Sequence, residues 1–243
     1  MKRNWNSYFL PAAAAVAGAA AALLRMGLYA WGLDEKGLLI PGHPLALGVW
    51  GITILTAVLT VLALRDPRPA GEDIPAVTAA GYLVLAAGIG LTVFCNREVW
   101  LTVEKLRNGL GLAAAAALLW LGWCRWKRKT PFFAFHALVC LYLALHTISH
   151  YQIWCSRPQM QNYLFPMAAS LLLALSAYCC AAEDVSLGKA RTAKAGVLLG
   201  IFFCLAAAVR EDASLYLPGA LWLFTRFPGI VPAPRKDDGH EAA

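Results

Sequence analysis

Charged residues are scarce in this sequence: Asp, Glu, Lys and Arg supply 14% of its 243 residues, whereas apolar types supply 60%. Soluble proteins draw about a quarter of their residues from the charged types. The charges that are present lie between long apolar runs and not within them. This distribution argues against a soluble globular fold, and it leaves no basic domain of the kind that binds nucleic acid.

Enzyme motifs are also missing. The sequence contains no H-E-x-x-H, no G-x-S-x-G and no G-x-x-x-x-G-K-[ST], which mark zinc peptidases, α/β hydrolases and P-loop nucleotide sites. Its seven cysteines show no C-x-x-C spacing, so they predict neither a zinc motif nor a disulfide framework. No apolar run carries a charge near its middle, where proton-coupled carriers and aspartyl intramembrane proteases usually need one. We therefore predict that the chain is not an enzyme.

Long uncharged runs are what the sequence does have, and a bilayer core requires about 20 apolar residues per helix. They predict an all-α fold, a polytopic transmembrane helix bundle with eight spans or, alternatively, seven. The bundle is predicted to form a single domain over residues 1–227 within the lipid bilayer, followed by a flexible charged tail over residues 228–243. The predicted spans cover residues 12–24, 45–64, 74–95, 109–123, 132–154, 163–182, 195–209 and 213–225.

The first and last runs leave alternatives open. Lys2 and Arg3 precede a short apolar region, which is typical also of a cleaved secretory signal, but the many spans that follow favour a membrane helix. Arg25 is predicted to end that helix, with a loop over residues 26–44. The last run is short and contains Pro218, so it is a span, a re-entrant piece or an interfacial helix.

The distribution of Lys and Arg favours eight spans. With an inside N terminus, eight spans place 14 of the 21 Lys and Arg residues on the inner side, whereas seven spans place 11 there. Cytoplasmic loops carry the excess of positive charge, so the sequence predicts a membrane protein with both termini in the cytoplasm. The inner set comprises Lys2, Arg3, Arg65, Arg68, Arg125, Lys127, Arg128, Lys129, Lys189, Arg191, Lys194, Arg226, Arg235 and Lys236.

Three of the five histidines lie in the run at 132–154. At 100° per residue, His136, His146 and His150 fall within about 80° of one another on one helical face. His146 and His150 are one helical turn apart near the predicted outer side, close enough to bind one transition-metal ion together with a carboxylate. The alternative is that each histidine bonds to a neighbouring helix or faces the wet interface, and no other cofactor is predicted. The carboxylates predicted on that side are Asp34, Glu35, Glu98, Glu104, Glu211 and Asp212.

Arg157 follows the same run and is flanked by Ser156 and Pro158. An arginine in this position can bind an anionic substrate or a lipid phosphate through two parallel N–H donors. The alternative is that it anchors the helix end or pairs with a loop carboxylate.

Small residues predict close helix packing. Ala14, Gly18 and Ala22 recur every four residues, and Gly88 and Gly90 mark a second small face. Such faces pack helices within one chain or between chains, as a homo- or hetero-oligomer. Two functions remain open: a non-enzymatic structural or accessory membrane component, or a permease or metal-binding membrane protein that uses the histidine-lined face.

The segment HALVCLYLALHTISHYQIWCSRPQMQNYLF, together with YLPGALWLFT near the end, resembles small multispan membrane proteins of anaerobic Gram-positive bacteria that are uncharacterised. The resemblance covers roughly residues 131–227. It implies a location in a bacterial plasma membrane and implies no activity, and it assigns no functional residues.

Overall fold

The computed structural model describes residues 5–34, 38–40, 42–64, 74–96, 102–154, 163–185, 187–209 and 212–230. In these ranges the chain forms eight α helices and a closing 3₁₀ turn, with no strand beyond an isolated bridge between Leu33 and Leu39. The predicted all-α class is confirmed. The elements are α1 (Trp5–Trp31), α2 (Pro44–Ala63), α3 (Pro75–Cys95), α4 (Thr102–Trp126), α5 (Phe133–Trp154), α6 (Leu164–Asp184), α7 (Ala190–Ala207), α8 (Ala213–Arg226) and η2 (Phe227–Gly229).

Seven of the described helices, α1 to α7, are long and apolar enough to cross a membrane. Their outer surfaces carry large apolar side chains, and on α2 Leu47, Ile54 and Val61 are each about 60% exposed. An apolar surface of this extent is suited to lipid and not to water. The chain is therefore a helical membrane bundle. Helix α8 is shorter, at 14 residues.

Polar side chains within the apolar helices bond to their own backbone. On α2 the hydroxyls of Thr53, Thr56 and Thr60 each donate to the carbonyl four residues earlier, at 2.8 Å. A hydroxyl that is satisfied in this way costs little in a lipid environment. Pro44 and Pro75 stand at the first position of their helices, where the missing N–H has no helical partner to lose.

Helix α1 passes through Arg25 and ends at Trp31, so the prediction that Arg25 ends this helix is wrong. Arg25 is 4% exposed, and its guanidinium donates to the Ala206 carbonyl at the end of α7. It also lies over the Phe165 ring, 4.5 Å from the ring centroid. Because the protein supplies these partners, the charge is accommodated within the helix.

Helices α4 and α7 begin earlier than the predicted spans. Helix α4 begins at Thr102 and not at Gly109, and α7 begins at Ala190 and not at Ala195. The added turns carry charged side chains, which end an apolar run without ending the helical hydrogen bonding. Hydropathy therefore located the lipid-crossing part of each helix, which a charged turn extends at its start.

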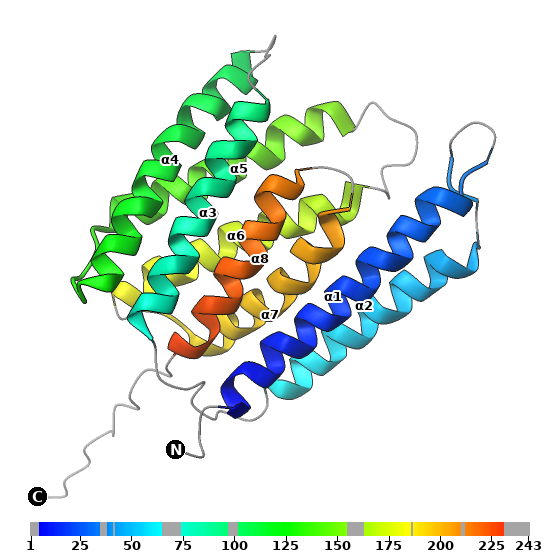
Figure 1. Cartoon of the computed structure of the whole chain (residues 1–243), viewed down its shortest axis with the longest axis horizontal. Coiled ribbons are helices and arrows are strands. Elements are labelled where there is room, and N and C mark those ends of the chain that lie inside the picture. Colours follow the sequence, from blue (N-terminus) through cyan, green and yellow to red (C-terminus); the bar gives the residue numbers. More distant parts are fainter. Residues whose placement is uncertain are drawn as a thin grey trace, which may run out of the picture.

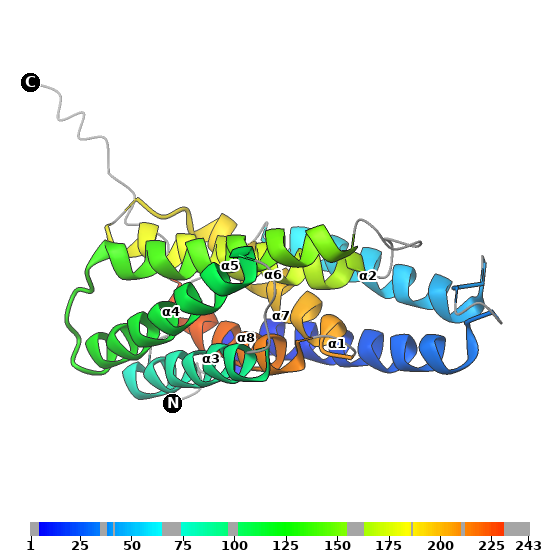
Figure 2. The ribbon, with the colours of Figure 1, turned by 90° about the horizontal axis from the view of Figure 1, so that it is seen from above.

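Successive helices run in opposite directions, and α8 packs against α3 and α7 (Figure 1). Figure 2 shows α2, α5 and α6 on one side of the bundle and α1, α3 and α8 on the other. Helix α1 begins where α8 ends, and the Tyr8 ring stacks on Phe224 there at 5.9 Å. We call this end, which includes the α4–α5 turn, the Arg125 end, and we call the opposite end, with the last turns of α5, the His150 end.

Two of the predicted small-residue positions are close approaches within the chain. A Cβ atom at Gly18 of α1 would meet the Phe202 carbonyl oxygen of α7 at 2.9 Å. A Cβ atom at Gly88 of α3 would lie 2.6 Å from Pro218 Cγ of α8. Gly90 has open space beside it, with nothing within 4 Å. Gly18 and Gly88 thus let α1 and α3 pack on helices of the same chain.

Candidate metal centre

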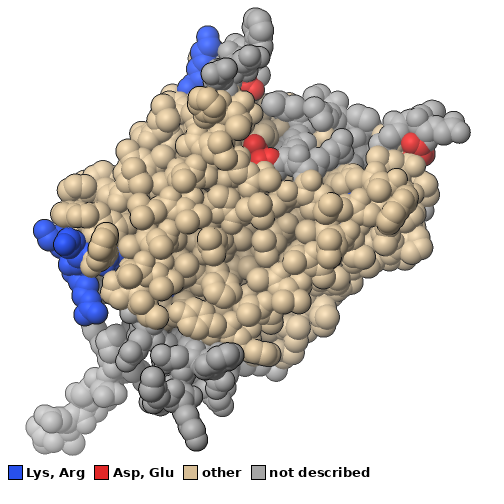
Figure 3. Space-filling model, viewed as in Figure 1, with Lys and Arg blue, Asp and Glu red and all other residues tan. Residues whose placement is uncertain are grey.

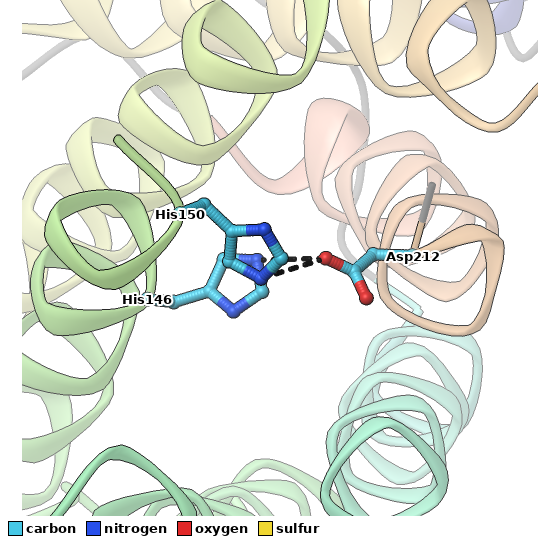
Figure 4. A group of neighbouring side chains, drawn as sticks. All are labelled: His146, His150 and Asp212. Carbon is cyan, nitrogen blue, oxygen red and sulfur yellow. Dashed lines mark ion pairs between the residues drawn. The ribbon is translucent and has the colours of Figure 1, made fainter. Parts of the chain in front are cut away.

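His146 and His150 of α5 meet Asp212, the residue that precedes α8, at the His150 end of the bundle (Figure 4). Asp212 Oδ2 lies 3.4 Å from His146 Nε2 and 3.1 Å from His150 Nε2. One ligand atom from each of the three residues lies within 4.8 Å of the other two. The structure thus brings one of the six carboxylates predicted on this side to the histidine pair.

Local backbone geometry explains how each side chain reaches the centre. One helical turn separates the two histidines, so their rings lie side by side with centroids 4.4 Å apart. Asp212 stands at the N-cap of α8 with a φ of 47°, in the left-handed region, and its carboxylate makes no cap hydrogen bond. Its carbonyl still accepts the first helical bonds, from the Leu215 and Tyr216 amides. The carboxylate is therefore directed at the histidines and not at the helix that it begins.

The centre is largely buried and incompletely hydrogen-bonded. His146 is 0% exposed, and both of its ring nitrogens lack a hydrogen bond in the described part of the chain. Asp212 Oδ2 is also buried without one there. Buried polar atoms normally have partners, so a cluster of three such atoms is suited to an additional ligand. Burial raises the pKa of Asp212, but the neighbouring His146, His150 and Arg107 outweigh it, so that pKa lies below its ordinary value.

The spacing of the ligand atoms fits a transition-metal ion. A tetrahedral Zn²⁺ with bonds of about 2.0–2.1 Å to nitrogen and oxygen holds neighbouring ligand atoms about 3.3 Å apart. The separations of Asp212 Oδ2 from His146 Nε2 and His150 Nε2, 3.4 and 3.1 Å, lie on either side of that value. Imidazole nitrogen and carboxylate oxygen are suitable ligands for Zn²⁺ and its neighbours in the first transition series. Three protein ligands would leave the fourth position open to another group.

Arg107 of α4 borders the centre and is 4% exposed. Its Nη1 lies 3.2 Å from Ser149 Oγ and 3.4 Å from His150 Nε2. Its Nε and Nη2 both donate to Asn108 Oδ1, at 3.2 Å each. Within the described ranges no carboxylate lies within ion-pair distance of this guanidinium. Among the described residues, the groups that contact this buried cation are thus a hydroxyl, an amide and an imidazole.

Two polar neighbours hold Arg107 in place. Asn108 Nδ2 donates to the Asn96 carbonyl at 2.7 Å, which ties the start of α4 to the end of α3. Ser149 Oγ donates to the His146 carbonyl at 2.9 Å, so its lone pairs face the guanidinium. Contacts at the ends of three helices, α3, α4 and α5, therefore hold Arg107 in position.

The third histidine of the predicted face does not join the centre. His136 Nε2 lies 2.9 Å from Asp184 Oδ2 at the Arg125 end, and the other oxygen of that carboxylate pairs with Arg125. Glu183 pairs with Arg226 at 2.6 Å beside it. This ion-pair network joins α4, α5, α6 and α8. His136 therefore has an assigned partner and a packing role.

Other predicted site residues lie apart from the centre or outside the described ranges. Asp34 Oδ1 accepts from the Leu38 amide at 2.7 Å in the α1–α2 connection. Glu104 lies in the first turn of α4 and is not in the three-residue group. Arg157 lies outside the described residues, so its anion-binding role stays a prediction. Glu35, Glu98 and Glu211 also lie outside them, so their predicted place near the histidines stays a prediction.

Sequence reasoning missed Arg107, which lies two residues before the apolar run predicted to begin at Gly109. Its signal was weak, because an arginine at that place is typical of any span end. Asn108 and Ser149 carried no signal at all.

Comparisons with protein-family models, with curated proteins and with solved structures found no match to this chain. The resemblance over residues 131–227 stays a prediction, and function is argued from the geometry of the chain itself.

Proposed function

We propose that this chain is a multi-pass protein of the bacterial plasma membrane that binds one divalent transition-metal ion, Zn²⁺ first among candidates, at its outer side. The observation that carries the proposal is the convergence of His146, His150 and Asp212 from two helices, with ligand atoms within 4.8 Å of one another. Of the two functions that the sequence leaves open, this arrangement favours a metal-binding membrane protein. No catalytic step is assigned to the ion, so the proposed role is non-enzymatic.

Eight membrane passes with both termini in the cytoplasm belong to the same proposal. Helix α8 supports them, because it runs from the His150 end back to the Arg125 end, where α1 begins (Figure 1). Its 14 residues rise about 21 Å, less than the roughly 30 Å of a bilayer core. Leu215 and Trp222 are 0% and 1% exposed, so one face of α8 packs against other helices, whereas Leu217 and Leu221, 50% and 49% exposed, lie on an outward face.

Positive charge supports a cytoplasmic Arg125 end. Figure 3 shows a molecular face almost free of charged side chains between its two ends. Of the described Lys and Arg residues, only Arg25, Lys105 and Arg107 belong to the His150 end. Loops rich in Lys and Arg remain in the cytoplasm, so the metal centre is assigned to the outer side. The described cations of the Arg125 end are Arg125, Lys127, Arg128, Lys129, Lys189, Arg191, Lys194 and Arg226.

Metal analysis of the purified protein tests the proposal. Protein dialysed against Zn²⁺ in detergent and then freed of loose ions should hold about one zinc per chain. The double variant His146→Ala with His150→Ala should hold none. His136→Ala is the matched control, because this histidine lies on the same helix at the other end, and it should hold zinc like wild type. Metal-free wild type, or zinc that survives in the double variant, would overturn the proposal.

A metal-free structural role is the second candidate, and one observation favours it. Arg107, His150 and Asp212 form a chain of contacts in which the imidazole separates a cation from an anion. Such a chain can join α4, α5 and α8 without any ion. In that case added Zn²⁺ would leave the thermal stability of the wild-type protein unchanged.

A further inference from the structure

We infer that the metal ion at this centre is held together with an oxyanion, a carboxylate or a phosphate group, which takes the fourth metal position and pairs with Arg107. The inference rests on the proposed metal site and names the class of ligand that completes it. Charge, lone pairs and the free edge of the guanidinium each lead to it.

Charge comes first. Among the described residues of the centre, one carboxylate, Asp212, lies near one buried guanidinium, Arg107, and imidazoles bind metal in their neutral form. A divalent ion added to these groups brings two further positive charges into a largely buried site. Arg107 Nη1 is 3.4 Å from His150 Nε2, itself a ligand atom, so the guanidinium and the ion would be close neighbours. An anion placed between the metal ion and the guanidinium would be attracted to both and would offset their mutual repulsion.

The lone pair of His150 Nε2 gives a second reason. In the structure described, this nitrogen lies within reach of both Arg107 Nη1 and Asp212 Oδ2. A metal ion would use the only lone pair on Nε2, so Arg107 could no longer donate to it. The guanidinium would then hold an unpaired N–H beside the open metal position. An oxygen bound to the metal is the acceptor that this N–H would require.

The orientation of the guanidinium gives a third reason. Its Nε and Nη2 edge is occupied, because both atoms donate to Asn108 Oδ1 at 3.2 Å. An arginine carries five N–H donors. Once Ser149 and Asn108 have accepted their hydrogen bonds, one hydrogen remains on each η nitrogen. Two parallel donors of this kind match the oxygens of a carboxylate or phosphate group. The edge left over is thus suited to an oxyanion.

The oxyanion has two possible sources, because the centre lies at the end of the bundle. It is a free ion or small solute from the outer side, or it is the phosphate of a lipid headgroup. The chemistry at Arg107 is the same for both, and the membrane used in the experiment separates them.

Cobalt spectroscopy of the full-length protein tests the inference. Co²⁺ replaces Zn²⁺ in tetrahedral sites and absorbs visible light with a spectrum that depends on its ligands. Co²⁺-loaded protein in a detergent without phosphate should change spectrum saturably on addition of inorganic phosphate or acetate. Co²⁺-loaded Arg107→Gln, compared with its own spectrum before phosphate is added, should bind phosphate about tenfold or more weakly than wild type, because a charge-assisted pair is lost. Lys105→Gln, which removes an exposed cation from the same helix, is the control and should bind phosphate like wild type.

The outcomes are distinct. If wild type binds Co²⁺ but no anion alters the spectrum, or if Arg107→Gln binds phosphate as wild type does, the inference is wrong while the metal site stands. If wild type binds no Co²⁺, both the metal site and the inference are wrong. In lipid nanodiscs without added phosphate, a shifted spectrum with phosphatidylglycerol indicates a headgroup ligand. An unshifted spectrum that then responds to inorganic phosphate indicates a soluble one.

Discussion

At the scale of single residues, Asp212 combines an unusual backbone conformation with the carboxylate of the proposed metal centre. It is one of two non-glycine residues with positive φ in the described chain, the other being Arg128. The left-handed conformation costs a residue with a Cβ atom about 1–2 kcal/mol, and aspartate is among the types that tolerate it best. Asp212 does not use its carboxylate to cap α8, which aspartate at this position usually does. Both departures have one explanation, which is that the carboxylate serves the histidine pair.

The first prediction concerns Asp212→Asn. Asparagine keeps the size of the side chain and tolerates the left-handed backbone, but it removes the anionic ligand. Zn²⁺ at a hundredfold excess over its dissociation constant should stabilise the wild-type protein by about 2.7 kcal/mol, which thermal unfolding in detergent detects as a higher midpoint. The variant should show little or no zinc-dependent shift. An equal shift in both proteins would mean that Asp212 is not a ligand.

At the scale of the elements, helix periodicity predicted the histidine pair but not its partners. Residues one turn apart on α5 must lie side by side, so the spacing of His146 and His150 sufficed. The approach of Asp212 depends on how α8 packs between α3 and α7, and that packing leaves no period in the sequence. Arg107 could not be foreseen as a neighbour of His150 for the same reason. Contacts between helices are set by the bundle, whereas contacts along a helix are set by the sequence.

A second prediction compares two glycines of α3. Gly88→Ala should destabilise the protein by about 1–3 kcal/mol, because the added methyl group would meet Pro218 Cγ at 2.6 Å and force α3 away from α8. Gly90→Ala should be neutral or stabilising by up to about 1 kcal/mol, since it meets nothing within 4 Å and alanine is the better helix former. Thermal unfolding in detergent measures both. The same loss in both variants would show that helix flexibility, and not the α3–α8 contact, is what Gly88 provides.

At the scale of the whole molecule, most of the architecture could be predicted because the lipid environment imposes it. All seven long helices correspond to predicted uncharged runs, since a bilayer excludes unpaired backbone groups and most charges. The error at Arg25 fell where protein replaces lipid as the environment. Arg25 continues α1 because its guanidinium reaches the Ala206 carbonyl and the Phe165 ring.

Topology yields the third prediction. A reporter that is active only in the cytoplasm, fused after Lys129 or after Gly239, should be active at both positions if the chain makes eight passes. The positive-inside rule requires this for Lys129, and the return of α8 to the Arg125 end requires it for the tail. Activity after Lys129 without activity after Gly239 would reduce the number of passes to seven. Activity at the tail without activity after Lys129 would place the metal centre in the cytoplasm.

X-ray absorption at the zinc edge of the zinc-loaded, full-length protein tests the central claim most directly. The account predicts four nitrogen or oxygen ligands at about 2.0–2.1 Å, with the outer-shell scattering of two imidazole rings. Sulfur at about 2.3 Å would contradict it, because that distance belongs to thiolate ligands and the chain has seven cysteines from which a different site could form. A first shell without imidazole scattering would equally assign the ion to a place other than His146 and His150.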